Sequence, residues 1–325
     1  MKHYSFVDYA TQAYSAFVAL LILFFHNDTV AHWPWLFAAH VAGIAAVHFM
    51  VVTASRTTSS KALDFFRHFY PVLFYTWFFC ETGHLNRMFF TEYLDPMVIR
   101  WEQALFGFQP SVSFMDKLPW LPVSELFYAS YFCYYIMISG VGIALFLRDR
   151  RQFFHYVTVV SFIFYICYTI YIFLPIIGPR VFFREIAGYA LSPEIQQLAS
   201  TDIYPDAVKS GVFYKLMGWI YRVFESPGAA LPSSHVAIAL TTVYFSFRYL
   251  RLIRWLHLAV AVLLCLSTIY CRYHYAVDVL AGLITVAVLL PFANWLYFKL
   301  GVEPAGNAAL TEKTRKVQAR PEISR

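Results

Sequence analysis

Residues 273–298 read YHYAVDVLAGLITVAVLLPFANWLYF, and this stretch limits the kinds of fold that the chain can adopt. From Ala276 to Phe298 the only charged side chain is Asp278, and the run is long enough for a helix to cross the roughly 30 Å of hydrocarbon in a membrane. An acidic side chain at the start of such a helix is costly unless it is paired or wetted. The stretch therefore predicts a membrane-spanning helix that begins beside a polar site.

Seven other segments have the same apolar character. Hydrophobic residues make up 60% of the 325 residues and charged residues 14%, which disfavours a soluble enzyme, a disordered chain or a nucleic-acid-binding protein. The sequence predicts an all-α fold, a polytopic membrane helix bundle of about eight transmembrane helices with short interfacial helices. The predicted spans are Tyr9 to Phe25, Trp33 to Thr53, Phe65 to Thr82, Val123 to Leu147, Phe153 to Leu174, Ser233 to Tyr249, Trp255 to Tyr270 and Ala276 to Phe298.

Lysine and arginine gather in every second connection, and such connections stay on the cytoplasmic side more readily than they cross the membrane. Basic clusters follow the second, fourth and sixth predicted spans at Arg56 and Lys61, at Arg148, Arg150 and Arg151, and at Arg248, Arg251 and Arg254, and the C-terminal tail is basic too. Both termini are therefore expected in the cytoplasm. The expected setting is a bacterial plasma membrane with a periplasmic or exterior active site, and a Golgi-like lumen is the alternative.

Two longer segments, residues 83–122 and 175–232, then remain on the exterior side, and each contains a short amphipathic run. In residues 93–106, Trp101 and Leu105 fall on the apolar face, opposite Asp95 and Glu102. This pattern predicts an interfacial helix that lies on lipid or packs on its own protein. Residues 214–224 form the second amphipathic run.

Three polar clusters are predicted to meet on the exterior side. Gly178-Pro179-Arg180 follows the fifth span, Pro232-Ser233-Ser234-His235 opens the sixth, and His274 with Asp278 stands at the start of the eighth. Ionisable side chains at membrane depth are costly unless they are paired or wetted, so clusters at one depth indicate a functional site.

The second cluster is typical of an anion site at the start of a helix. Proline is favoured in a first helical turn, and free backbone N–H groups there attract a phosphate. Ser233 and Ser234 are the candidate phosphate contacts, and His235 can reach the same pocket as a proton donor. The alternative is a serine N-cap beside a histidine that is satisfied by the headgroup region.

His274 and Asp278 are four residues apart and therefore share one face of a helix. The carboxylate can accept the proton on one ring nitrogen, which leaves the other nitrogen as a base or nucleophile. Arg180 supplies a permanent cation whose planar guanidinium suits phosphoryl oxygens, unless lipid headgroups hold it instead. Arg272 is a further candidate phosphate contact, although its loop can equally direct it into water.

At these residues the chain resembles the type 2 phosphatidic acid phosphatase superfamily. Pro232-Ser233-Ser234-His235 matches the signature Pro-Ser-Gly-His, and Ser267, His274 and Asp278 match the spacing of the next signature. The resemblance covers about Asp95 to Pro291. Within the superfamily, the chain is most similar to the branch that includes inositol phosphorylceramide synthases.

Two positions depart from the superfamily pattern. Phe173 and Thr268 stand where a lysine and an arginine would contact phosphate. The synthase branch tolerates these losses, and Arg272 and Lys209 are the candidates to replace one of the cations.

The resemblance implies a six-helix catalytic core and a two-step phosphoryl transfer that needs no metal and no cofactor. His274 would attack phosphorus, Asp278 would hold it in place, and His235 would protonate the departing oxygen. Water, or a lipid alcohol, would then take the phosphoryl group from His274. The expected domains are an N-terminal two-helix membrane anchor (1–60), a phosphatase-like catalytic membrane domain (61–300) and a disordered basic cytoplasmic tail (301–325).

Several functions remain open at this level. A phosphatase would release phosphate from a lipid, whereas a transferase would move inositol phosphate or a similar head group to a lipid alcohol. A non-catalytic protein that binds or moves lipids is a further alternative, and an acyl-transfer triad of Ser233, His274 and Asp278 lacks the Gly-x-Ser-x-Gly elbow. The expected partners are a membrane lipid substrate and the bilayer, with no nucleic acid and with protein partners unknown.

Overall fold

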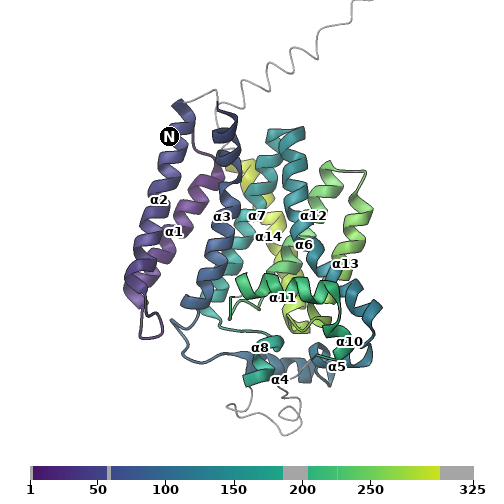
Figure 1. Cartoon of the computed structure of the whole chain (residues 1–325). Helices are drawn as coiled ribbons and strands as arrows, with labels where there is room; N and C mark the ends of the chain where they lie inside the picture. The colour runs from purple at the N-terminus through teal and green to yellow at the C-terminus, as the bar shows by residue number, and fades with distance from the viewer. Residues whose placement is uncertain (1–2, 57–59, 186–203, 225, 301–325) are drawn as a thin grey trace, which may run out of the picture.

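The computed structural model describes residues 3–56, 60–185, 204–224 and 226–300, and these residues form a bundle of helices (Figure 1). The helices are α1 (Phe6–Phe25), α2 (Trp33–Arg56), α3 (Lys61–Leu85), α4 (Asp95–Phe106), α5 (Pro110–Lys117), α6 (Leu121–Arg148), α7 (Arg150–Phe173), α8 (Pro179–Glu185), α10 (Asp206–Lys209), α11 (Val212–Phe224), α12 (Ser234–Tyr249), α13 (Arg254–Tyr270) and α14 (Ala276–Leu300). Within these ranges the sole β contact is an isolated bridge between Ile176 and Ala229. The predicted all-α bundle is confirmed.

A helix lies at each of the eight segments predicted to span the membrane. Among the described residues, α1, α2, α6, α7 and α14 are long and apolar enough to cross a bilayer, and α13 is a shorter apolar helix. Helix α7 contacts α1, α3, α6, α12 and α14, so it occupies the centre of the bundle. The predicted tail, residues 301–325, lies outside the described residues.

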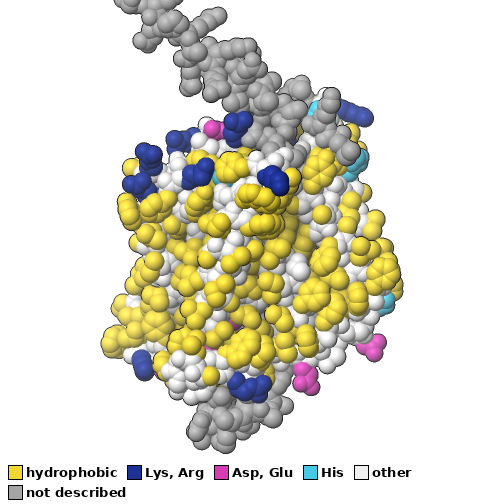
Figure 2. Space-filling view, turned by 180° about the vertical axis from the view of Figure 1, so that it is seen from behind, with side chains coloured by type: hydrophobic (Ala, Val, Ile, Leu, Met, Phe, Trp, Pro, Cys, Tyr) yellow, Lys and Arg dark blue, Asp and Glu magenta, His cyan; other side chains and the backbone are white. Residues whose placement is uncertain are grey.

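The surface of the bundle is that of an integral membrane protein. Figure 2 shows a broad belt of hydrophobic side chains across one face, with lysine and arginine side chains gathered mainly along its upper end. Large apolar side chains such as Phe49, Leu147 and Ile284 are exposed by 72%, 77% and 65%. Contiguous exposure of this kind is unfavourable in water and favourable against lipid tails.

The short helices α4, α5, α8 and α10 gather at the end of the bundle opposite the N-terminus (Figure 1). Helices α4 and α11 occupy the two amphipathic runs predicted from the sequence. In α4, Trp101 and Leu105 are exposed whereas Asp95 and Glu102 are fully buried, and this burial of the acids was not predicted. Both acids turn inward because buried hydrogen-bond donors lie there, as described below.

A buried ion pair joins the first and third helices at the other end of the bundle. Both terminal nitrogens of Arg67 on α3 donate to the carboxylate of Asp8 on α1, which also accepts hydrogen bonds from Tyr70 Oη (2.7 Å) and from the Ser5 hydroxyl (2.8 Å). The side chain of Asp8 is fully buried and that of Arg67 is 10% exposed. The pair therefore connects α1 to α3 across residue 60, where the sequence predicts a domain boundary.

We expect Asp8→Ala to lower the unfolding temperature of the detergent-solubilised protein. The Arg67 charge would stay buried without its partner, which costs about 3–5 kcal/mol. The double variant Asp8→Leu, Arg67→Met removes both charges and should regain most of the loss. Thermal unfolding followed by circular dichroism measures this, and an Asp8→Ala variant as stable as the wild type would contradict it.

Candidate active site

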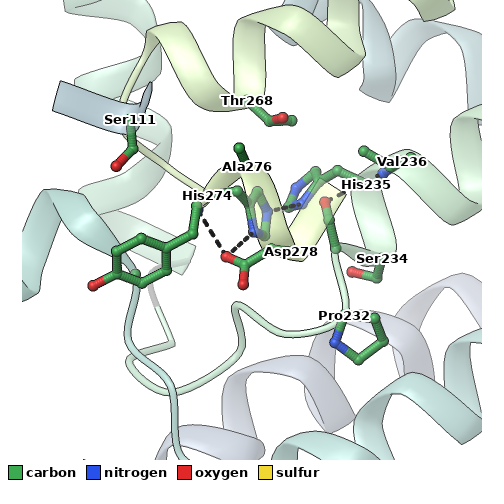
Figure 3. A network of polar contacts seen from close by, with 12 residues as sticks. Ser111, Pro232, Ser234, His235, Val236, Thr268, His274, Ala276 and Asp278 are labelled. Atoms are coloured by element: carbon green, nitrogen blue, oxygen red, sulfur yellow. Dashed lines mark hydrogen bonds and ion pairs between the residues drawn. The ribbon is translucent and has the colours of Figure 1, made fainter. Parts of the chain in front are cut away.

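The three residues predicted to carry the chemistry lie together at the starts of α12 and α14 (Figure 3). His274 Nδ1 is 3.4 Å from Asp278 Oδ2, and His274 Nε2 is 3.3 Å from Nδ1 of His235. The carboxylate also accepts the Tyr275 N–H at 2.9 Å. Asp278 is fully buried and His274 is 3% exposed. The carboxylate thus holds one ring nitrogen of His274 and directs the other toward His235.

Helix α12 begins where it does because a serine caps it. The hydroxyl of Ser233 accepts the N–H of Val236 at 3.4 Å, and the N–H of Ser233 donates to the backbone carbonyl of Asp278 at 3.0 Å. Tyr171 on α7 donates to the carbonyl of Pro232 (2.7 Å) and accepts the N–H of Ser234 (3.1 Å). These bonds place His235 in the first turn of α12, beside His274.

The same bonds change what the sequence led us to expect of this helix start. The amides of Ser233, Ser234 and Val236 already have acceptors within the protein, so they are not the free anion-binding amides that were predicted. Both serine side chains are buried, Ser233 fully and Ser234 to 3% exposure. Their roles as phosphate contacts stay predictions.

Arg180 is brought to the histidines by close contact between two loops. Its N–H donates to the carbonyl of Arg272 at 2.8 Å. The preceding Gly178 has φ +86°, and a Cβ there would lie 2.7 Å from the carbonyl oxygen of Tyr273, so only glycine permits this approach. The Arg180 guanidinium lies over the rings of Tyr221 (4.7 Å) and Tyr273 (5.6 Å).

One cavity unites these groups. It is small and partly open to solvent, and Arg180, His235 and His274 all line it. The stacked rings of Tyr221 and Tyr273, 4.3 Å apart, form another part of the wall. A cation and two imidazoles around one cavity can neutralise and orient a phosphoryl group.

Arg272 is placed elsewhere. Its guanidinium donates to Asp116 Oδ1 at 2.5 Å and to the carbonyl of Val112 at 3.2 Å, and it is not among the residues that line the cavity. Lys209, the other candidate replacement, pairs with Asp206 on α10 at 3.2 Å. The structure therefore brings neither of the two candidate cations to the histidines.

Two acids of α4 hold the loops of the site, and sequence reasoning did not give them this role. Asp95 accepts hydrogen bonds at 2.9 Å from the N–H groups of Ile177 and Gly178 and from the Tyr275 hydroxyl. Glu102 accepts from the N–H of Ala276. Asp95 therefore links the loop that precedes Arg180 to the loop that carries His274. Glu102 supports Ala276, the first residue of α14.

The acids were detectable in the sequence only indirectly. The resemblance begins at about Asp95, but nothing in the periodicity of α4 distinguished its buried acids from solvated ones. The ring centroids of Tyr131 and Tyr134 on α6 lie 5.1 and 4.6 Å from that of His235. Sequence reasoning did not place these two rings beside His235, because the chain has many aromatic residues.

The two acids should make stability depend on pH. Burial raises the pKa of Asp95 from 3.8, and that of Glu102 from 4.5, to about 7 in each case. Each carboxyl thus binds its proton more tightly in the folded state, and this contribution is present at low pH and is lost as the pH rises through about 7. We expect the unfolding temperature to fall between about pH 4 and about pH 7, with a shallower slope in Asp95→Asn and Glu102→Gln.

The exposed Glu92 provides the matched control. Glu92→Gln should keep the wild-type slope of unfolding temperature against pH. Variants of Asp95 and Glu102 that kept the same slope as Glu92→Gln would contradict the prediction.

Comparison with known proteins agrees with the geometry of the site. A family model described as the PAP2 superfamily matches residues 96–292, or 197 of the 325 residues. The match runs from α4 into α14 and includes Arg180, His235 and His274. No significant match to the chain is found among curated proteins or among solved structures. Because the family model covers more than half of its length, the chain belongs to the PAP2 superfamily.

Proposed function

We propose that this protein is a metal-independent lipid phosphatase or phosphotransferase that forms a phosphohistidine at His274. The observation that carries the proposal is the line of contacts from Asp278 through His274 to His235, at 3.4 and 3.3 Å, on a cavity that Arg180 also lines. Membership of the PAP2 superfamily and the long apolar helices support a membrane phosphatase-type enzyme.

In the first step, Nε2 of His274 attacks phosphorus and the bond to the leaving oxygen breaks. The Asp278 carboxylate keeps the proton on Nδ1 and stabilises the cationic ring that results. A proton on the His235 ring passes to the leaving oxygen. Arg180 stabilises the negative charge on the phosphoryl oxygens.

In the second step, an oxygen nucleophile attacks phosphorus and the bond to Nε2 breaks. His235, now neutral, takes the proton of the nucleophile, and His274 returns to its starting state. With water as nucleophile the product is inorganic phosphate or a phosphate monoester. With a lipid alcohol the product is a new phospholipid, the outcome that the resemblance to the synthase branch implies.

We place the site at the exterior face of the membrane. Its loops lie at the end of the bundle opposite the N-terminus, and basic side chains gather mainly at the other end (Figures 1 and 2). By the bias of lysine and arginine toward the cytoplasm, this arrangement supports cytoplasmic termini and an exterior or periplasmic site.

Replacement of the nucleophile should abolish the intermediate. Incubation of the wild type with a ³²P-labelled lipid phosphate, followed by alkaline quench, should yield acid-labile label on His274. We expect His274→Gln to lose the label and to reduce turnover by ~10³-fold or more, because the ring nitrogen that attacks phosphorus is gone. His257→Gln, which changes a histidine in the first turn of α13 that does not line the cavity, is the control and should keep both. Full turnover by His274→Gln would refute the phosphohistidine mechanism.

Product analysis separates the two versions of the reaction. The purified enzyme is given phosphatidic acid alone, a phosphoinositide with a lipid alcohol, and the phosphoinositide without it. Free phosphate from the first mixture supports a phosphatase. A new phosphodiester lipid that forms only with the alcohol supports a transferase, and turnover in none of the mixtures would count against both.

A further inference from the structure

A helix outside the matched family segment reaches the cavity. Phe79 lines it, although this residue belongs to α3 and lies before residue 96, where the family match begins. The amino-terminal helices therefore do more than add membrane-embedded surface. Through Phe79, α3 contributes directly to the shape that a ligand of the cavity must fit.

The end of α3 also holds the turn Ser226–Pro227–Gly228, here called the rim turn, of which Ser226 and Pro227 line the cavity. The hydroxyl of Ser226 accepts the N–H of Gly83 at 2.9 Å and donates to the carbonyl of Cys80 at 3.3 Å. The side-chain amide of Asn86, just beyond α3, donates to the carbonyl of Pro227. Backbone and side chains of α3 thus hold this part of the wall in place.

The contact between the rim turn and α3 requires a glycine at position 228. Gly228 has φ +101°, and a Cβ there would stand 1.5 Å from the Asn86 side-chain nitrogen. Any larger residue would force the rim turn away from α3. The rim turn is therefore shaped to this helix, and the cavity wall that it forms depends on α3 being present.

Two chemical kinds of group line the cavity. Arg180, His235 and His274 are polar and suit an anionic phosphoryl group. Phe79, Pro227 and the aliphatic side chains of Ile177 and Val181 are apolar. A ligand that satisfies both kinds carries an anionic head joined directly to a hydrocarbon chain.

We propose that Phe79 and the rim turn form a subsite for the hydrocarbon next to the phosphate of a membrane lipid, with Phe79 as a specificity-determining residue. The identity of the anionic head rests on the proposed function, whereas the chain subsite rests on the apolar wall. No bond changes at this subsite. Its effect should therefore appear in the affinity for long chains rather than in the affinity for the phosphoryl group.

The test measures binding of two soluble, hydrolysis-resistant probes, propylphosphonate and octylphosphonate. Full-length protein in zwitterionic nanodiscs is titrated by calorimetry, with empty nanodiscs subtracted to remove partitioning of octylphosphonate into lipid. We expect the wild type to prefer octylphosphonate. Phe79→Ala should weaken octylphosphonate binding ~10-fold, because apolar contact area is lost, and change propylphosphonate binding less than about twofold.

Phe66→Ala provides the matched control, because it makes the same change on the same helix at an exposed position outside the cavity. It should leave both affinities unchanged. If Phe79→Ala fails to fold, Phe79→Leu and Ser226→Ala serve as milder variants that should weaken octylphosphonate binding selectively. Equal effects of the Phe79 variants on the two probes, or no effect on either, would overturn the subsite.

This test is separable from that of the proposed function. If wild-type protein shows chain preference that depends on Phe79 but forms no phosphohistidine, the chain subsite stands and the catalytic proposal falls. If phosphohistidine forms normally and the Phe79 variants keep the wild-type chain preference, the catalytic proposal stands and the subsite falls.

Discussion

The pairing of the Asp278 carboxylate with the His274 ring is the interaction on which the rest of the site depends. A carboxylate at the start of a membrane helix is costly without partners, and Oδ2 finds two of them in His274 and the Tyr275 N–H. This pairing aims His274 Nε2 at His235. The backbone of Asp278 in turn accepts the N–H of Ser233, so the same residue also positions the start of α12.

Buried acids organise the surrounding loops as well. Asp95 holds the backbone that precedes Arg180 and the Tyr275 hydroxyl, and Glu102 holds the N–H of Ala276. The donors are backbone groups of irregular segments, which would otherwise be buried without acceptors. Burying two carboxyls is costly, and this cost is offset by the hydrogen bonds that position the loops carrying Arg180 and His274.

The predictions that succeeded and those that failed differ in the kind of information they required. Eight apolar runs predicted eight helices correctly because hydrocarbon length and hydrogen bonding within a helix are local properties. The burial of the acids of α4 was not predicted, because periodicity identifies two faces but not which partner each face meets. Arg272 was a reasonable phosphate contact by its position in the chain, yet Asp116, more than 150 residues earlier, holds its guanidinium.

By itself, the sequence determined that the chain is a helical membrane bundle, and it singled out His235, His274, Asp278 and Arg180 as candidate reactive groups, since residue type and local spacing carry that information. The tertiary structure decided that Arg180 and the two histidines line one cavity, that the acids of α4 support their loops, and that Phe79 of α3 forms part of the wall. These contacts join segments far apart in the chain. Their distances follow from how the helices pack together, which local pattern does not encode.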